Sequence, residues 1–340
     1  MNYNRIVNNI KSIFVLFVLP YRNAKYLEAG LYKYNHTVNA LYRSEHESIY
    51  SKELRDKLFA QQSSSTNVFR NIYSSLYRAF IHGIKKSFSG QLMVISTSEK
   101  EYKFFDFKQK RLLTLYTDGN RFSSILKNRI QWSKFFAVPT FDYDEEKREI
   151  SESLLDSDVF NYDKTVDRLV DELSLSHFSI FSNYRVNNSF ENYAVESFLS
   201  EIGRSNYLED LLGFISSDCF RTTLSHGDLW RSNLLWSNEV LYYLDYEMIG
   251  NRVFFYDLFT FIFSEAYFLN NIEALKKYVL GKYDLIFEKL FRHAGVKYCG
   301  ENRNTYLYVF LYLYYQERWS RVEHKEVLDK LSSILNIIGV

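Results

Sequence analysis

The sequence predicts an α+β protein in which a small β-rich part precedes a larger helical part. Proline occurs only twice and glycine only 12 times in 340 residues, so the chain offers few turns and favours long helices. Three short runs with strand character follow one another between residues 92 and 117, and amphipathic helical periodicity dominates from Asp156 onward. At 340 residues the chain is long enough for both parts and one further segment.

The further segment is the N-terminal 88 residues, which we expect to form a basic helical extension. Residues 1–90 contain 13 Lys and Arg against 5 Asp and Glu, a net charge of +8, so the rest of the chain carries −7. A polar run at 61–67 and a Ser-Phe-Ser-Gly sequence at 87–90 put the boundary near residue 89. Such a segment suits contact with an anionic membrane surface, reception of a polyanionic substrate, or a plain solvated extension.

Composition narrows the class of protein. Two cysteines, Cys219 and Cys299, provide neither a disulfide framework nor a zinc-binding pair, which predicts a reduced, cytoplasmic setting. The longest apolar runs, 13–19 and 306–315, are shorter than the roughly 18 residues that span a bilayer. The first run is not followed by a small-residue cleavage site, so no secretion signal is expected. Nucleic acid is not an expected partner, because no nucleic-acid-binding signature accompanies the basic residues.

The β-rich part is predicted to span residues 89–155. Short runs of β-branched and aromatic residues separated by polar turns predict an antiparallel meander, then a helix, then a second hairpin around an acidic turn. The expected elements are strands at 92–96, 102–107 and 112–117, a helix at 120–136, and strands at 140–143 and 149–153.

The helical part is predicted to span residues 156–340. Its amphipathic segments are interrupted only by two strand-like pieces, at 234–236 and 240–244, around a Ser-Asn turn. The expected helices lie near 163–175, 190–203, 205–216, 253–269, 272–293 and 303–339.

One stretch of the helical part carries recognisable chemistry. It reads Leu-Ser-His-Gly-Asp-Leu-Trp-Arg-Ser-Asn at 224–233. Asn233 follows Asp228 by five residues, and Asp245 follows Asn233 by twelve. Phosphoryl transfer from a nucleotide needs one carboxylate for the acceptor hydroxyl and hard oxygen ligands for Mg²⁺. A loop and a returning hairpin could bring these three side chains together, although each of them alone also suits a turn or a helix cap.

With Tyr-Leu-Asp-Tyr-Glu at 243–247 and Tyr-Asp-Leu at 256–258, this stretch resembles the catalytic loop of the aminoglycoside phosphotransferase and choline kinase family. That family belongs to the protein-kinase-like fold, so the resemblance implies a bilobal protein with a small β-rich lobe and a large helical lobe. It implies that Asp228 is the catalytic base and that Asn233 and Asp245 hold Mg²⁺. It also implies that His226 braces the loop and that Asp257 ties the loop backbone from a helix start.

The two halves of the motif point to different branches of the family. Leu-Asp-Tyr-Glu at 244–247, with Gly250 five residues after Asp245, is similar to choline and ethanolamine kinases. His-Gly-Asp-Leu-Trp at 226–230 is closer to sugar-directed members such as the fructosamine kinases. The acceptor therefore stays open between these classes.

The predicted nucleotide lobe departs from the active kinase pattern. Kinases place a lysine on the third strand and pair it with a glutamate on the next helix. Here the strand at 112–117 contains no lysine and the helix at 120–136 contains no acid. Arg111 is the expected substitute cation, with Lys103 and Lys110 as alternatives.

Two further features of the sequence bear on ligands. The Ser-Glu-Ser-Leu segment at 151–154 resembles the family's adenine-binding hinge, which makes Glu152 and Leu154 expected nucleotide contacts. The aromatic runs at 254–263 and 306–315 either line a substrate pocket or belong to the helical core.

Together these features predict an ATP- and Mg²⁺-dependent phosphotransferase acting on a hydroxyl of a small molecule or a sugar. The sugar of a surface glycan or of a lipid-linked acceptor is one option, and choline, ethanolamine or an aminoglycoside is another. A pseudokinase that binds nucleotide or a partner without catalysis is the alternative class. The expected location is cytoplasmic, with peripheral contact to the inner membrane surface through residues 1–88 as an option.

Overall fold

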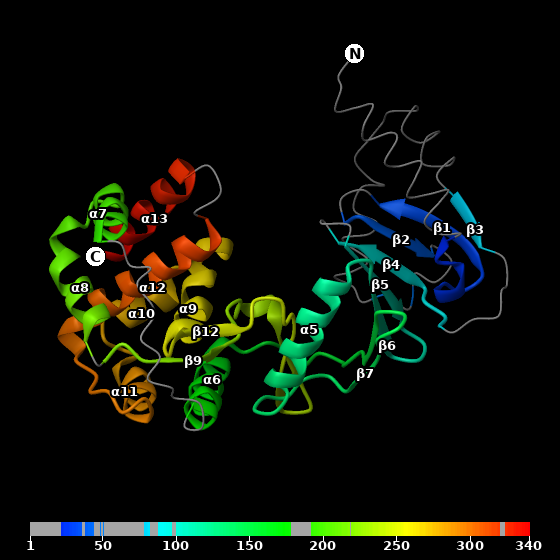
Figure 1. The fold of residues 1–340 in the computed structure, drawn as a ribbon, viewed down its shortest axis with the longest axis horizontal. Coiled ribbons are helices and arrows are strands. Elements are labelled where there is room, and N and C mark those ends of the chain that lie inside the picture. Colours follow the sequence, from blue (N-terminus) through cyan, green and yellow to red (C-terminus); the bar gives the residue numbers. More distant parts are fainter. Residues whose placement is uncertain are drawn as a thin grey trace, which may run out of the picture. The chain divides into compact units, whose positions relative to one another are not determined.

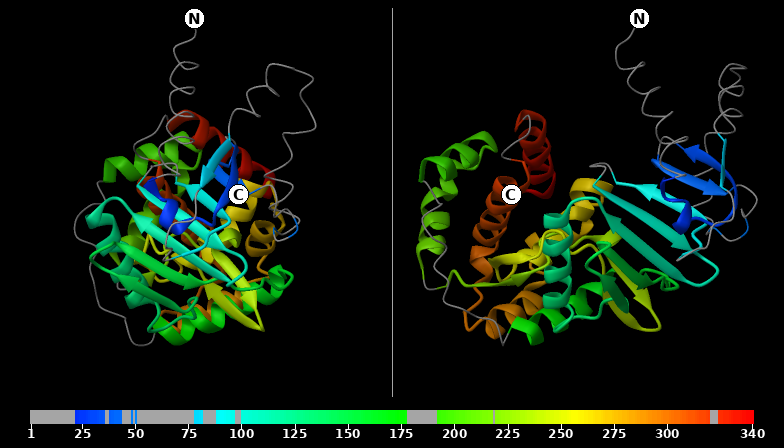
Figure 2. Two further views of the ribbon diagram at one scale, coloured as in Figure 1. Left: turned by 90° about the vertical axis from the view of Figure 1, so that its right-hand side faces the viewer. Right: turned by 45° about the vertical axis from the view of Figure 1, so that its right-hand side comes forward.

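The computed structural model contains two compact units (Figures 1 and 2). The sheet unit comprises Met1–Leu126 and Pro139–Asp156, and the helical unit comprises Lys127–Val138 and Ser157–Val340. Within them the structure describes residues 22–35, 38–43, 48, 50, 78–81, 88–96, 100–177, 192–217, 219–319 and 324–340. A β-sheet unit and a helical unit are the two parts that the sequence predicts, so the α+β class is confirmed.

The sheet unit is built on one eight-stranded sheet in which all the paired neighbours are antiparallel. The strand order is β3-β1-β2-β4-β5-β6-β8-β7. The strands are β1 (Gly30–Asn35), β2 (Ala40–Arg43), β3 (Arg78–Ile81), β4 (Leu92–Ile95), β5 (Glu101–Asp106), β6 (Arg111–Tyr116), β7 (Phe141–Asp144) and β8 (Glu149–Ser153).

The expected meander and hairpin are confirmed. β4, β5 and β6 start and end within a residue or two of the predicted runs, and β7 and β8 form the second hairpin. Helix α5 (Gly119–Trp132) follows β6, as predicted, and ends a few residues earlier than expected. Asp118 caps it, because its carboxylate accepts hydrogen bonds from the backbone N–H groups of Asn120 and Arg121.

The expectation of a separate helical extension over residues 1–88 is wrong for its described part. β1, β2 and β3 belong to the same sheet, and β2 pairs directly with β4. Tyr32 and Leu41 share one buried core with Met93 and Phe104. The boundary near residue 89 therefore falls inside the sheet unit. Strands on its two sides share backbone hydrogen bonds, and apolar side chains on its two sides share one core. The runs at 13–19 and 61–67 lie outside the described residues.

The helical unit contains eight α-helices among its described residues, with two short β-ladders. The ladders pair β9 (Thr222–Ser225) with β12 (Gly250–Val253) and β10 (Leu234–Ser237) with β11 (Val240–Tyr243). The helices are α6 (Tyr162–His177), α7 (Asn192–Glu201), α8 (Leu208–Ser216), α9 (Tyr256–Leu269), α10 (Glu273–Val279), α11 (Asp284–His293), α12 (Arg303–Arg318) and α13 (His324–Ile338).

Two predicted long helices are each divided in the structure. The segment at 272–293 forms α10 and α11, and Gly281 stands between them with φ of +75°. A Cβ at this glycine would lie 2.7 Å from the Arg303 guanidinium, so the turn requires glycine. The segment at 303–339 forms α12 and α13. Helical periodicity continues across both breaks, which is why the sequence predicts single helices.

The core of the helical unit is aromatic. α9 and α12 are buried around most of their circumference, which is typical of central helices. Phe259 of α9 packs against Tyr278, Phe287 and Phe310 at ring-centroid distances of 4.9 to 5.3 Å. The aromatic runs of the sequence therefore form core, and the alternative of a pocket lining does not hold for them. Among the described residues, no helix is long and apolar enough to cross a membrane.

Truncating one central ring should destabilise the protein far more than truncating a peripheral ring of the same helix. Phe259 is fully buried, whereas Phe268 at the end of α9 is 47% exposed. We expect Phe259→Ala to lower the free energy of unfolding by about 3–5 kcal/mol. Phe268→Ala should cost about 1 kcal/mol, because less apolar area leaves water there on folding. Urea unfolding of both variants measures this, and equal losses would contradict the central role of Phe259.

Candidate active site

The stretch with recognisable chemistry lies in a loop that leaves the short strand β9. His226 follows β9 directly, and the chain then passes through a 3₁₀ turn at Arg231–Asn233 into the β10–β11 hairpin. The hairpin turn consists of Asn238 and Glu239, which both have positive φ, as a two-residue turn of this kind requires. β11 then brings the chain back, and the Leu244 N–H donates to the Asn233 carbonyl at 2.9 Å. Asp245 is the residue that follows Leu244, so this hydrogen bond brings it close to Asn233 along the chain.

Asp228 and Asn233 are bonded to each other. The Asn233 Nδ2 donates to the backbone oxygen of Asp228 at 2.8 Å and to its carboxylate Oδ2 at 3.0 Å. Asn233 is largely buried, so these bonds hold its amide plane in one orientation. Since its nitrogen faces Asp228, its carbonyl oxygen is the atom left to bind another group.

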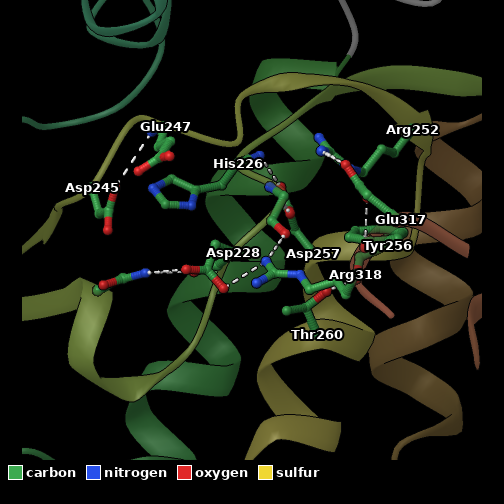
Figure 3. Close-up of polar contacts among 12 residues, drawn as sticks. His226, Asp228, Asp245, Glu247, Arg252, Tyr256, Asp257, Thr260, Glu317 and Arg318 are labelled. Carbon is green, nitrogen blue, oxygen red and sulfur yellow. Dashed lines mark hydrogen bonds and ion pairs between the residues drawn. The ribbon is translucent and has the colours of Figure 1, made fainter. Parts of the chain in front are cut away.

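Asp245 stands in the left-handed region, with φ of +64°. Few residues other than glycine adopt this conformation, and Asp is among those that tolerate it. Backbone strain of this kind is found at functional sites more often than elsewhere. Its carboxylate accepts a 3.4 Å hydrogen bond from the Glu247 N–H (Figure 3).

His226 braces the loop from the buried side. Its ring is fully buried, its Nε2 lies 3.0 Å from the Leu244 carbonyl oxygen, and Trp132 packs edge-on against it at 5.3 Å. Burial lowers the pKa of His226 to about 3, although the Leu244 hydrogen bond acts in the opposite direction. Its Nδ1 has no hydrogen-bond partner among the described residues. The ring is therefore neutral and positions the loop, and its burial does not suit direct proton transfer with a substrate.

Asp257 binds two backbone N–H groups of the loop. It lies in the first turn of α9, and its two carboxylate oxygens accept the backbone N–H groups of His226 at 2.6 Å and of Gly227 at 2.9 Å. Burial raises the pKa of Asp257 to about 6, against the lowering effect of these two hydrogen bonds.

Gly227 is required by the geometry of the loop. Its φ is +79°, and a Cβ built there would lie 2.4 Å from the Met248 carbonyl oxygen and 2.5 Å from the Arg252 guanidinium carbon. No other residue type fits without displacing one of these groups. The middle position of the His-Gly-Asp sequence is therefore set by close packing.

Arg318, the last residue of α12, holds the opposite side of the loop and was not singled out by the sequence. Its Nη2 donates to the Gly227 carbonyl oxygen and to the Asp228 Oδ1, both at 2.6 Å. Figure 3 shows the Asp228 carboxylate and the Arg318 guanidinium facing each other. The sequence contains one signal for this role, because a Gln-Glu-Arg sequence follows directly on the aromatic and apolar run at 306–315.

A second ion pair supports the same helix end. Glu317 forms a two-point ion pair with Arg252, whose Nε lies 2.8 Å from Glu317 Oε2. The Tyr256 hydroxyl donates to the same oxygen at 2.9 Å. Since Arg252 also packs against Gly227, the end of α12 and the loop are connected at several points (Figure 3).

The residues expected to contact nucleotide lie in the sheet unit, at one end of the β6–β8 pairing. Arg111 is the first residue of β6, and its Nη2 donates to the Ser151 hydroxyl at 2.8 Å. Glu152 pairs in register with Leu112, and the Leu154 N–H donates to the Lys110 carbonyl at 2.8 Å. Arg111, Glu152 and Leu154 are therefore neighbours, and their contact with nucleotide stays a prediction.

Among the described residues, no group of three or more His, Cys, Asp and Glu side chains could hold a metal ion. A metal at the loop would therefore depend on the amide oxygen of Asn233 together with Asp245.

The buried state of His226 should be visible in the pH dependence of stability. Its pKa is about 3 in the folded protein against an ordinary value of 6.5, so between these pH values the unfolded chain binds a proton that the folded chain does not. Stability is therefore lost as the pH falls through this window. Between pH 6 and pH 5 the wild type should lose about 1 kcal/mol more than His226→Gln in urea unfolding.

Asp257 should have the opposite effect on the pH dependence of stability, because its pKa is raised in the folded protein. Its pKa is about 6 when folded against 3.8 ordinarily, so its contribution to stability is complete below pH 3.8 and is lost as the pH rises through 6. Asp257→Asn should therefore steepen the loss of stability on acidification, where His226→Gln makes it shallower. If stability changed with pH in the same way in the wild type and both variants, the shifted pKa values of buried His226 and Asp257 would be contradicted.

Comparison with known proteins finds similar solved structures, several of them kinases of small molecules. No family model and no curated protein sequence matches the chain. An amicoumacin kinase solved with AMP-PNP and Ca²⁺ is 12% identical, with 72% of this chain and 87% of that chain covered and a TM-score of 0.42. The choline kinase of Streptococcus pneumoniae is 13% identical, with coverages of 72% and 90% and a TM-score of 0.40. A putative fructosamine-3-kinase of Thermobifida fusca is 13% identical, with coverages of 69% and 89% and a TM-score of 0.41.

The choline kinase and the fructosamine kinase are of two kinds that the motif at 224–258 resembles. At identities and TM-scores this low, a match does not carry function.

Proposed function

We propose that the protein is an ATP-dependent phosphotransferase that acts on a hydroxyl group of a small molecule or sugar. The observation that carries this proposal is the arrangement of Asp228, which is held by Arg318 on one carboxylate oxygen and by Asn233 on the other. A carboxylate held in this way is oriented before the acceptor arrives, so little reorganisation is needed during transfer.

The chemistry assigned to the loop is an in-line displacement. The acceptor oxygen forms a bond to the γ-phosphorus as the bond between that phosphorus and the β–γ bridging oxygen breaks, and ADP leaves. Asp228 orients the acceptor hydroxyl and takes its proton. Arg318 and Asn233 keep both oxygens of Asp228 in place during this step.

The donor set of the loop fits a divalent cation such as Mg²⁺. Asn233 offers an amide oxygen because its nitrogen is bonded to Asp228, and Asp245 offers a carboxylate one residue beyond the Leu244 contact. Amide and carboxylate oxygens are the hard ligands that Mg²⁺ takes, and it keeps waters or phosphate oxygens for the rest. When bound, the cation would neutralise charge that develops on the phosphates.

The acceptor stays a matter of proposal. The motif supports a sugar, choline, ethanolamine or an aminoglycoside, and a surface glycan or lipid-linked sugar adds the option of work at a membrane. Peripheral membrane contact through residues 1–88 and a cytoplasmic location stay predictions. The described part of that segment contributes β1, β2 and β3 to the sheet.

A pseudokinase is the second candidate, and one observation favours it. β6 contains no lysine and α5 contains no acidic residue, so the usual strand–helix ion pair of kinases cannot form there. A pseudokinase would bind MgATP without releasing ADP in the presence of any acceptor.

Replacing the proposed base should separate binding from transfer. We expect Asp228→Asn to lower the rate of ADP release with an acceptor by about 10²–10⁴-fold, because proton removal is lost, while the Kd for MgATP stays close to the wild-type value. The acceptor panel contains choline, ethanolamine, aminoglycosides and sugars, and the phosphorylated product is identified by mass spectrometry. Asp210→Asn, on the exposed face of α8, is the matched control. Unchanged turnover in Asp228→Asn would remove this residue from its role.

Removing Arg318 should impair transfer through Asp228 without affecting nucleotide binding. Arg318→Met takes away one partner of the Asp228 carboxylate and one of the Gly227 carbonyl, for which we expect turnover to fall about 10- to 100-fold. Arg318→Lys should recover part of it, since one charged donor returns. Arg292→Met, at an exposed ion pair in α11, serves as the control. Normal turnover in Arg318→Met, with normal folding, would contradict the proposed arrangement.

A further inference from the structure

The sheet unit contains a three-residue charge cluster formed by Lys103, Glu101 and Arg121. We propose that Lys103 is the cation that contacts the phosphates of the bound nucleotide, and that Glu101, anchored by Arg121, positions it. This inference rests on the proposed function, since it requires that the protein binds MgATP. It replaces Arg111, which the sequence favours for this role.

Strand register brings Lys103 beside the position where a kinase lysine is expected. β5 and β6 pair so that Lys103 lies opposite Thr114, a buried residue in the middle of β6. Opposed residues in an antiparallel pair point to the same face, with their Cβ atoms about 5 Å apart. A lysine on β5 can therefore supply its ammonium to the region that a lysine at Thr114 would serve.

The face concerned is the one that α5 covers in part. Glu101 and Lys103 are two residues apart on β5 and so share a face, and their partners on β6 are Tyr116 and Thr114. The ring of Tyr116 lies 5.8 Å from that of Phe122 in the first turns of α5, and both belong to one buried cluster. Lys103 is thus on the helix-facing side of the sheet.

The ion pair between strand and helix is present with its charges exchanged. Glu101 is almost fully buried, and its Oε2 accepts hydrogen bonds from Nε and Nη2 of Arg121 in α5, both at 3.3 Å. Its other oxygen, Oε1, lies 3.5 Å from Nζ of Lys103. The ordinary kinase arrangement has a strand lysine and a helix glutamate. Here the strand carries the acid and the helix the base, and the same acid also holds a lysine.

Lys103 is better placed to bind a phosphate than the other cations considered. Its side chain is 41% exposed, and Glu101 is its one carboxylate partner among the described residues. An ammonium group has three donors, so donors remain for a ligand. Arg111 sits at the end of β6, bonded to Ser151, and Lys110 lies in the preceding turn, paired with Asp156. Neither of them is near the middle of the strand.

The test is calorimetric titration of the full chain with MgATP and, separately, with adenosine. We expect Lys103→Met to weaken MgATP binding by about 10- to 100-fold, the loss expected for one charge-assisted contact, and to leave adenosine binding unchanged. Lys103→Arg should retain most of the affinity, since the charge stays. Lys147→Met, at an exposed ion pair in the β7–β8 turn, is the matched control and should bind MgATP like the wild type. Arg111→Met and Lys110→Met compare the rival assignments and should lose less affinity than Lys103→Met.

The position of Lys103 is tested through its partner. Glu101→Gln keeps the shape of the side chain and removes its charge, so MgATP binding should weaken less than in Lys103→Met, with adenosine again unaffected. Melting temperatures without ligand show which variants are folded. If Lys103→Met does not fold, Lys103→Arg keeps the test valid.

The possible failures can be told apart. If the wild type binds MgATP and Lys103→Met binds it equally well, or if Arg111→Met alone loses the affinity, the assignment of Lys103 is overturned and the proposed function stands. If the wild type does not bind MgATP, the proposed function falls, and the assignment of Lys103 falls with it.

Discussion

The loop at 226–233 depends on two side chains, the buried Asp257 and the partly buried Arg318, that hold its backbone from opposite sides. Asp257 accepts the N–H groups of His226 and Gly227, and Arg318 donates to the Gly227 carbonyl. The loop has left its β-ladder at this point, so no neighbouring strand can satisfy these backbone groups. Leaving them unpaired in the interior would cost more than burying an acid and a base that bond them.

The aromatic core of the helical unit fixes the positions of these two side chains. Asp257 lies in the first turn of α9 and Arg318 ends α12, and both helices belong to the same aromatic core. A change in that packing would move the carboxylate and the guanidinium relative to the loop, and the direction of Asp228 would change with them. The packing of the core and the geometry of the candidate site are therefore linked, since a close-packed interior transmits strain.

Much of the fold and of the loop follows from the sequence. The β4–β5–β6 meander was predictable because alternating apolar residues and polar turns are local signals. The predicted helix at 272–293 is wrong because periodicity persists through Gly281, where only the close approach of Arg303 reveals the turn. The predicted helical extension is wrong for its described part because β1 and β2 are short and β2 pairs with β4, a distant strand that no local pattern reveals. Arg318 could not be paired with Asp228 for the same reason.

By itself the sequence determined which residue types stand at Asp228, Asn233 and Asp245, and at what spacing, because these are read within one continuous stretch. Only the tertiary structure decided which side chains hold them, and that Lys103 lies opposite Thr114 with Glu101 between it and Arg121. The physical reason is that a hydrogen bond or ion pair acts over a few ångströms, whereas Asp228 and Arg318 are separated by 90 residues of chain, and only packing and strand register bring such partners together.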